Sequence, residues 1–174
     1  MYFYRIKPRD KTMITIKTAS FDDIETIRQL ADKIWHEAYA EILSPEQISY
    51  MLNWMYSSET IKKEIIEGSS WEVIVEGNTP IGFISTTVEG TSLKLSKLYI
   101  NPAYHSKGYG QESLNHIKEM ARGKGIQSVY LTVNKGNLKA MKAYEKAGFT
   151  RTDSKVFDIG GGYVMDDFIY TCTL

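Results

Sequence analysis

Residues His105 to Gly110, with the sequence HSKGYG, could bind a phosphate group through their main chain. The apolar residues up to Ile100 predict a buried strand before this segment, and Pro102 ends that strand because it has no N–H group. After the segment, apolar residues at three- and four-residue spacing from Leu114 to Ala121 predict a helix. The first turn of a helix presents unpaired N–H groups at the positive end of the helix dipole, and such a turn binds anions.

Gly108 and Gly110 suit this purpose because they lack a Cβ atom, so an anion can approach their main chain closely. A Walker loop is excluded because the required Gly-Lys-Ser/Thr ending is missing. A Rossmann fingerprint is excluded because Ser113 stands where its third glycine would be. On this segment alone, two interpretations stay open: a phosphate-binding turn, or a flexible turn that binds nothing.

A second segment, from Asn134 to Phe149, follows the strand-like run SVYLTV. Together with the turn, it resembles the acetyl-CoA-dependent N-acetyltransferases of the GNAT superfamily. Their acetyl-CoA motif, Gln/Arg-x-x-Gly-x-Gly/Ala between a strand and a helix, falls on His105 to Gly110, with His at the first position. Their second motif, Asn-x-x-Ala-x-x-x-Tyr-x-x-x-Gly-Phe, is met at Asn137, Ala140, Tyr144, Gly148 and Phe149. The resemblance extends from about Met13 to the end of the chain.

The resemblance implies a GNAT-like α/β (α+β) fold, with a mixed, mostly antiparallel central sheet flanked by helices, and acetyl-CoA as cosubstrate. It places the pantetheine arm along the main chain of the central strand, where an N–H group polarises the thioester carbonyl. Asn137 would hydrogen-bond this arm, although an Asn there equally suits the N-cap of its own helix. The implied cofactor-binding residues are Leu98, Tyr99, Ile100, His105, Ser106, Lys107, Gly108, Tyr109, Gly110 and Asn137.

Two of these side chains keep alternative interpretations. Lys107 either adds positive charge beside a phosphate or is a solvated surface lysine. His105 can donate one hydrogen bond as a neutral imidazole, but it lacks the fixed charge of the Arg that many relatives carry.

Tyr144 is the catalytic residue that the resemblance implies. When an amine attacks the thioester directly, a thiolate leaves, and a positioned phenol can protonate it as general acid. A phenol with its ordinary pKa near 10 holds its proton at neutral pH. The alternative is a core residue, because Tyr144 follows Met141 at helical spacing. No general base is assigned: many relatives use a Glu on the central strand, where this chain has Ser96 and Lys97.

For the acceptor, the resemblance places Trp35, His36 and Tyr39 beside the thioester as substrate-binding residues. With the Ser44-Pro45-Glu46 helix start and a late Asp166-containing strand, they resemble the PaiA-type bacterial spermidine/spermine acetyltransferases. Carboxylates would line a polyamine slot or be solvated; the candidates are Glu37, Glu41, Glu46 and Asp166. The alternatives are acetylation of a protein N-terminus or lysine, a non-catalytic CoA-binding sensor, and a binder of nucleotide phosphates.

Composition sets outer limits on these interpretations. The chain has 174 residues and a formal net charge of zero, so one N-acetyltransferase domain is expected, without nucleic-acid or membrane partners. Residues 1–12 are expected to be an N-terminal extension. The single cysteine, Cys172, suits a reducing cytoplasm, and no ligand spacing suggests a metal. The substrate is expected to be a small-molecule amine, and exposed final strands suggest a homodimer.

The periodicity of apolar residues places the remaining elements. Strands are expected near residues 13–19, 71–75, 81–88, 93–100, 128–133, 149–157 and 163–172. Helices are expected to begin near residues 22, 45, 58, 110 and 138. Ser20 or Asp22 would cap the first helix, and Ser44 the second.

Overall fold

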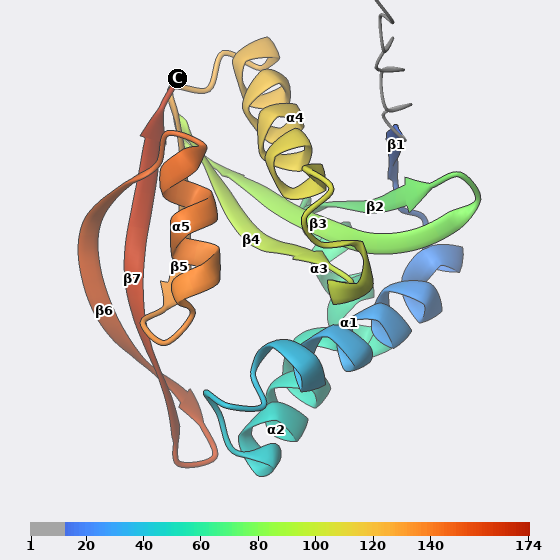
Figure 1. The fold of residues 1–174 in the computed structure, drawn as a ribbon, viewed down its shortest axis with the longest axis vertical. Helices are drawn as coiled ribbons and strands as arrows, with labels where there is room; N and C mark the ends of the chain where they lie inside the picture. The colour runs from blue at the N-terminus through green and yellow to red at the C-terminus, as the bar shows by residue number, and fades with distance from the viewer. Residues whose placement is uncertain (1–12) are drawn as a thin grey trace, which may run out of the picture.

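One seven-stranded sheet organises the computed structural model, which describes residues 13–174. Its strand order is β1-β2-β3-β4-β5-β7-β6 (Figure 1). Among these strands only β4 and β5 pair in parallel, so the predicted mixed, mostly antiparallel sheet is confirmed. The strands are β1 (Ile14–Thr18), β2 (Ser70–Glu76), β3 (Thr79–Glu89), β4 (Ser92–Ile100), β5 (Ser128–Asn134), β6 (Thr150–Gly160) and β7 (Tyr163–Thr173). The predicted N-terminal extension, residues 1–12, lies outside the described residues.

The helices begin where their capping residues predict. Ser20 accepts a hydrogen bond from the Asp22 N–H group at the short helix η1, which leads directly into α1. Ser44 accepts one from the Gln47 N–H group (3.1 Å), and Pro45 is the first residue of α2. The α-helices are α1 (Ile24–Ala38), α2 (Pro45–Tyr56), α3 (Ser58–Ile66), α4 (Tyr109–Gly123) and α5 (Leu138–Lys146), and the 3-10 helices are η1 (Phe21–Asp23) and η2 (Pro102–Tyr104).

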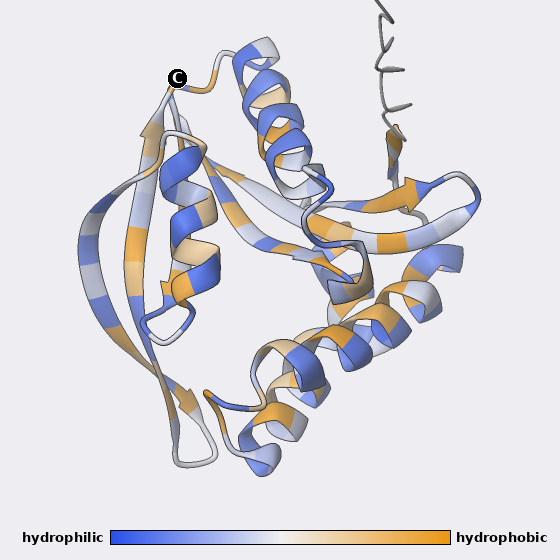
Figure 2. Ribbon diagram, viewed as in Figure 1, coloured by the Kyte–Doolittle hydropathy of each residue, from blue (hydrophilic) through white to orange (hydrophobic). Residues whose placement is uncertain are grey.

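Two hydrophobic cores lie on the two faces of the sheet. One core contains residues of α4 and α5, such as Leu114 and Met141, together with β3, β4, β5 and β7. The other contains residues of α1, α2 and α3, such as Ile34, Met51 and Ile61, against β2 and β3. The helices carry both hydrophobic and hydrophilic positions along their length (Figure 2), because each buries one face against a core.

A β-bulge at Ser96 changes the direction of the side chains along β4. On β3, Ser85 pairs with Lys97 whereas the next residue pairs with Leu95, so Ser96 is the extra residue of the bulge. Leu95 therefore packs in the core of α4 and α5, whereas Lys97 lies among aromatic rings of the other core. This bulge is the physical reason for the interrupted alternation at residues 96 and 97.

The centre of the sheet opens beyond the first residues of β4. Strands β4 and β5 pair only from Ser92 to Lys94, with Ser128 to Tyr130 as partners. Beyond these residues the two strands diverge (Figure 1), so β5 does not pair with the main chain of β4 from Leu95 onward. Apart from the Ile100 carbonyl, which accepts a hydrogen bond from the His105 ring (2.8 Å), the N–H and C=O groups on that edge are available to another extended chain.

Candidate active site

A cleft of about 1560 Å³ lies where β4 and β5 separate. Small-molecule sites usually enclose roughly 300–1,000 Å³, so this cleft has room for two reactants together. Its walls come from β4, the start of α4, one face of α5, the end of α1, and parts of α2, α3, β5, β6 and β7. All the residues predicted to bind the cofactor line it: Leu98, Tyr99, Ile100, His105, Ser106, Lys107, Gly108, Tyr109, Gly110 and Asn137.

The turn before α4 presents its main chain to this cleft. Gly108 has φ +88°, a left-handed conformation that glycine adopts easily, and Ser106 has φ +64°. A Cβ atom placed on Gly108 or Gly110 would meet no other atom within 4 Å, so the approach to both is open. The N–H groups at the start of the 15-residue helix α4 face this opening. The turn therefore fits a diphosphate such as that of CoA.

His105 positions a lysine beside the turn. Its Nε2 atom lies 2.8 Å from the Ile100 carbonyl oxygen, which can only accept, so Nε2 carries the hydrogen. The other ring nitrogen, Nδ1, then accepts from the Lys139 ammonium at 2.7 Å. His105 thus replaces the fixed charge of an Arg with a hydrogen bond to a lysine of α5.

Two further lysines lie along the same face of α5. Lys139, Lys142 and Lys146 all line the cleft, at positions that share one helix face. The spacing in the sequence could have indicated this basic stripe, but the prediction did not include it. Lys107 instead forms an ion pair with Glu76 (2.9 Å), and this hydrogen bond raises the pKa of the Lys107 ammonium. The stripe and the turn together could hold a phosphorylated ligand.

Tyrosine hydroxyls gather in the centre of the cleft. The hydroxyls of Tyr39 and Tyr99 lie 3.1 Å apart, and Tyr144 interacts electrostatically with both. Burial raises the pKa of the phenol of all three, so each holds its proton at neutral pH. Tyr144 also packs against Phe149 and Tyr170, so it belongs to the core and to the cleft at once.

Asn137 likewise has two contacts. Its side-chain oxygen accepts from the Ala140 N–H group (3.1 Å) and caps α5, as the alternative interpretation predicted. Its side chain also hydrogen-bonds the Tyr39 hydroxyl, an interaction that lowers the pKa of Tyr39 against the larger effect of burial. The cap therefore orients Asn137 toward the tyrosine hydroxyls.

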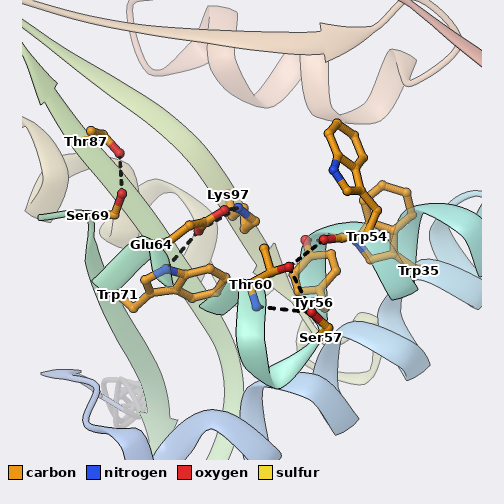
Figure 3. Close-up of polar contacts among 10 residues, drawn as sticks. All are labelled: Trp35, Trp54, Tyr56, Ser57, Thr60, Glu64, Ser69, Trp71, Thr87 and Lys97. Atoms are coloured by element: carbon orange, nitrogen blue, oxygen red, sulfur yellow. Dashed lines mark hydrogen bonds and ion pairs between the residues drawn. The ribbon is translucent and has the colours of Figure 1, made fainter. Parts of the chain in front are cut away.

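Lys97 occupies a buried aromatic site on the floor of the cleft. Its ammonium lies 4.8 Å from the centre of the Trp71 ring and 3.3 Å from Glu64 Oε2 (Figure 3). The Trp71 indole N–H donates to the same carboxylate at 3.1 Å, which fixes Glu64 in place. Burial lowers the pKa of Lys97, and the Glu64 charge opposes that shift. Lys97 is thus a cation whose charge is balanced inside the protein by a carboxylate and an aromatic ring.

The acceptor end of the cleft is closed by contacts between α2 and the β6–β7 hairpin. The Tyr50 hydroxyl donates to the Ile159 carbonyl (2.7 Å), and the Gln47 side-chain amide donates to the Val164 carbonyl (3.0 Å). Trp54, which is 49% exposed, lines this end, and its indole extends away from Tyr56 (Figure 3). A rigid aromatic wall of this kind can shape the acceptor site.

His36 is not in the cleft, contrary to the prediction. Its ring donates through Nδ1 to the Asp32 carbonyl (2.7 Å) on the exposed side of α1. Trp35 and Tyr39 do line the cleft because they are four residues apart and share one helix face, from which His36 is turned away. Trp35 is 1% exposed and donates its indole N–H to the Tyr56 hydroxyl, so it supports the wall from behind.

The acidic residues are distributed differently from the expectation. Of the four candidates only Glu37 lines the cleft, and Asp166 forms an ion pair with Lys135 (2.5 Å) outside it. Three other carboxylates, Glu64, Asp158 and Asp167, line the cleft and were missed. Adjacent acids on a strand point to opposite faces, so Asp166 and Asp167 could have signalled that one faces inward.

The described part of the chain shows neither a metal centre nor a membrane-spanning helix. Among residues 13–174, no group of three or more His, Cys, Asp or Glu side chains is arranged to hold a metal ion. No helix in the same range combines the length and hydropathy of a membrane span.

The sequence was compared with protein families, curated proteins and solved structures. The profile of the Acetyltransferase (GNAT) family matches residues 24–149. The spermidine N(1)-acetyltransferase of Thermoplasma acidophilum is 30% identical over 158 residues, which cover 88% of this chain and 96% of the relative. The [ribosomal protein bS18]-alanine N-acetyltransferase of Haemophilus influenzae is 29% identical over 108 residues, covering 62% and 72%. The PaiA N-acetyltransferase of T. acidophilum, solved in complex with coenzyme A, superposes with a TM-score of 0.80 at 29% identity, covering 93% and 99%.

Proposed function

Because the chain belongs to the acetyltransferase (GNAT) family and is an acetyl-CoA-dependent N-acetyltransferase, we propose that its acceptor is a polyamine such as spermidine. The observation that carries this proposal is the likeness over 88% of the chain to a spermidine N(1)-acetyltransferase. The cleft wall carries carboxylates that suit a substrate with several ammonium groups, and they support the proposal; they are Glu37, Glu64, Asp158 and Asp167.

Acetyl-CoA, when bound, supplies an acetyl group activated as a thioester. We propose that the N–H groups from Ser106 to Gly110 bind its diphosphate, and that Lys139 adds positive charge beside them. The unpaired edge of β4 from Leu98 to Ile100 would receive its extended arm through main-chain hydrogen bonds. Asn137 would orient that arm from the start of α5.

Tyr144 is the proposed general acid. Its phenol lines the cleft and interacts with the hydroxyl pair of Tyr39 and Tyr99, and burial keeps its proton in place. The same burial disfavours a free thiolate, so transfer of the phenol proton to the departing sulfur is favoured. The proposed substrate-binding residues are Trp35 and Tyr39, with His36 removed from the set.

The first experiment measures thiol release from acetyl-CoA with a panel of primary amines: spermidine, spermine, a peptide N-terminus, a lysine peptide and an aminoglycoside. The polyamine proposal expects kcat/KM for spermidine to exceed that for every non-polyamine by at least about tenfold. Preference for a peptide would favour the second candidate function, protein acetylation, which the partial likeness to the bS18-alanine enzyme supports. If no amine causes thiol release although acetyl-CoA binds, a non-catalytic sensor would be favoured.

Tyr144→Phe tests the proposed acid within the same assay. The variant removes only the phenolic hydroxyl, so we expect kcat to fall by about 100-fold or more while acetyl-CoA still binds. Tyr130→Phe is the matched control, because the Tyr130 hydroxyl donates to Glu89 at the other end of the sheet. Equal rates for both variants would remove Tyr144 from the mechanism.

The proposal also covers the number of domains, the oligomeric state and the compartment. We propose a single N-acetyltransferase domain, in which both cores share one sheet. The free edge of β6, with Val156 59% exposed, supports a homodimer, which light scattering during gel filtration would test. The free, buried Cys172 is in keeping with the cytoplasm as the compartment, which cell fractionation would test.

A further inference from the structure

Asp167 is a buried carboxylate that the structure leaves unpaired in the wall of the cleft. Its side chain belongs to β7 and is 5% exposed. One of its oxygens, Oδ1, is buried and has no hydrogen-bond partner among residues 13–174. A buried carboxylate without a cation is costly, because neither water nor an opposite charge stabilises it. In a substrate cleft, such a carboxylate can be paired by a positively charged group of the substrate.

The charged and titratable groups around Asp167 do not provide this partner. On β7 itself, Asp166 is a second negative charge, and it already pairs with Lys135 outside the cleft. The Lys135 charge also acts on Asp167, but burial outweighs it, so the pKa of Asp167 stays raised. Lys155, the cross-strand neighbour of Asp167 on β6, turns its ammonium to the Phe157 ring at 5.1 Å. From β5, the Thr132 hydroxyl hydrogen-bonds the carboxylate.

Tyr39 is the tyrosine of the cleft that interacts with Asp167. Burial raises the pKa of the Tyr39 phenol, and the Asp167 charge adds to that effect, so the hydroxyl that Asp167 meets is neutral. Tyr39 in turn contacts the Tyr99 hydroxyl at 3.1 Å and interacts with Tyr144. Asp167 and Tyr144 thus line the same cleft and both interact with Tyr39. The charged neighbours of Asp167 in the described chain are already engaged or of like sign.

We propose that Asp167 is the general base of acetyl transfer: it binds the ammonium of the acceptor through its unpaired oxygen and removes a proton from it. This inference rests on the cleft being the site of acetyl transfer, but it does not depend on which amine is the acceptor. It also supplies a base that β4 lacks, since the family resemblance implies a Glu on this strand where the chain has Ser96 and Lys97.

The proton balance of the reaction is complete with these two residues. Asp167 takes one proton from R–NH₃⁺, and the freed lone pair forms the N–C bond to the acetyl carbonyl carbon. The C–S bond breaks, and the sulfur takes the Tyr144 phenol proton. The nitrogen loses its second proton to the Tyr144 oxygen, which restores the phenol, and Asp167 releases its proton to solvent. The products are R–NH–acetyl, a thiol and one proton.

The environment of Asp167 strengthens it as a base. Burial raises its pKa from 3.8 to about 6, so the group is ionised at neutral pH yet accepts a proton more readily than an exposed aspartate. Proton transfer from an ammonium to a carboxylate also converts an ion pair into two neutral groups, which a poorly solvated site favours.

The test compares Asp167→Asn with Asp166→Asn, a matched control one residue away that faces out of the cleft. Both are assayed from pH 5 to 9 with spermidine, or with whichever amine of the panel the wild-type enzyme acetylates best. We expect Asp167→Asn to lower kcat at least 100-fold at pH 7.5 and to abolish the fall of kcat/KM below pH about 6. Acetyl-CoA binding should stay close to wild type in both variants. Asp166→Asn should keep its rate and its acidic limb, moved slightly to lower pH because the Asp166 charge adds to the effect of burial on the pKa of Asp167.

Two results would overturn the proposal. An Asp167→Asn variant that raises KM with kcat unchanged would make Asp167 a binding residue only, and an unchanged acidic limb would exclude it as the base. Asp167→Glu should restore the limb at a reduced rate, because it returns a carboxylate at a slightly different place. Carbon NMR of aspartate-labelled protein needs no substrate: if no signal lost in Asp167→Asn titrates near pH 6, the proposal fails even where the acceptor is unknown.

Discussion

Lys97 and Asp167 are both buried charged residues in the wall of one cleft, but only Lys97 has its charge balanced inside the protein. Its ammonium has the Glu64 carboxylate at 3.3 Å and the Trp71 ring at 4.8 Å. Asp167, equally buried at 5% exposure against 6% for Lys97, has an oxygen with no partner among the described residues. The protein thus completes one charge site by itself and leaves the other incomplete.

The difference indicates separate roles for the two sites. A charge that is paired and hydrogen-bonded can be kept for structure, because its partners offset the loss of water. A charge that is buried and unpaired lowers stability, so its presence is better explained by what it does for a ligand. We therefore expect changes at the Lys97 site to lower the free energy of unfolding. We expect changes at the Asp167 site to lower the catalytic rate and to raise stability.

The largest effect on stability is expected from Glu64→Gln. This change removes the counterion of Lys97 and leaves an ammonium buried among aromatic rings, which should cost about 3 kcal/mol in the free energy of unfolding. For a chain of this length that corresponds to a melting temperature lower by roughly 10 °C. Thermal and urea unfolding of the two proteins would measure it.

The control for this change is Glu67→Gln. Glu67 directly follows α3, and its carboxylate is 61% exposed and 3.8 Å from Lys63. It should alter stability by well under 1 kcal/mol. A double variant, Lys97→Met with Glu64→Gln, should recover most of the loss, because it replaces the ion pair with neutral groups. Equal stability of Glu64→Gln and wild type would show that Lys97 is not buried as described.

Asp167→Asn should act in the opposite direction and stabilise the protein. The folded state binds a proton on Asp167 more tightly than the unfolded state, since the pKa rises from 3.8 to about 6. Stability from this group is therefore lost as pH rises from about 4 to about 6, and the loss is complete above that range. The shift corresponds to at most about 3 kcal/mol. We expect about half of it, because the Lys135 charge and the Thr132 hydroxyl offset part of the cost of burial.

The measurement is the difference in unfolding free energy between Asp167→Asn and wild type across pH. We expect the variant to be about 1.5 kcal/mol more stable at pH 7.5, and the difference to vanish near pH 4. A variant that is less stable at pH 7.5 would mean that the carboxylate has a cation inside the folded protein, and the contrast with Lys97 would disappear.

The sequence predicted the elements of the fold well, because each carries local signals. Ser20 and Ser44 cap helices where expected, and the hairpin turn between β2 and β3 lies at Gly77. The mixed sheet was also predicted, from the interleaving of the expected strands and helices and from the resemblance to a family, but the strand order was not. Strand pairing joins residues far apart in the chain, so periodicity alone could not supply it.

The site was predicted where a motif fixes the main chain, and less well where side chains meet across elements. The turn at Gly108 needs only local sequence. His105 was expected at a phosphate, yet it bonds Lys139, which is 34 residues away. Asp167 was not predicted as a site residue. Its oxygen is unpaired because the neighbouring parts of β5, β6 and α1 place no free cation beside it, and a local sequence pattern cannot indicate that. His36 was misplaced because a helix turns about 100° at each residue.

The smallest and most specific effect is expected from Thr132→Val. The Thr132 hydroxyl hydrogen-bonds the Asp167 carboxylate and lowers its pKa, against the larger effect of burial. Val keeps the shape of the side chain and removes only this bond, so the pKa of Asp167 should rise by less than about one unit. The acidic limb of kcat/KM should then move to higher pH by the same amount, with the rate at pH 8 little changed.

Thr171→Val is the matched control, because its hydroxyl bonds Thr152 on the other side of the hairpin. A limb that moves in Thr132→Val but not in Thr171→Val ties the pH profile to Asp167 without removing the carboxylate. An unmoved limb in both would mean that another group titrates there, even if Asp167→Asn is inactive. A small displacement of a pH profile is therefore stronger support for a base than a large loss of rate, because disturbed packing can lower a rate but does not move one pKa in a chosen direction.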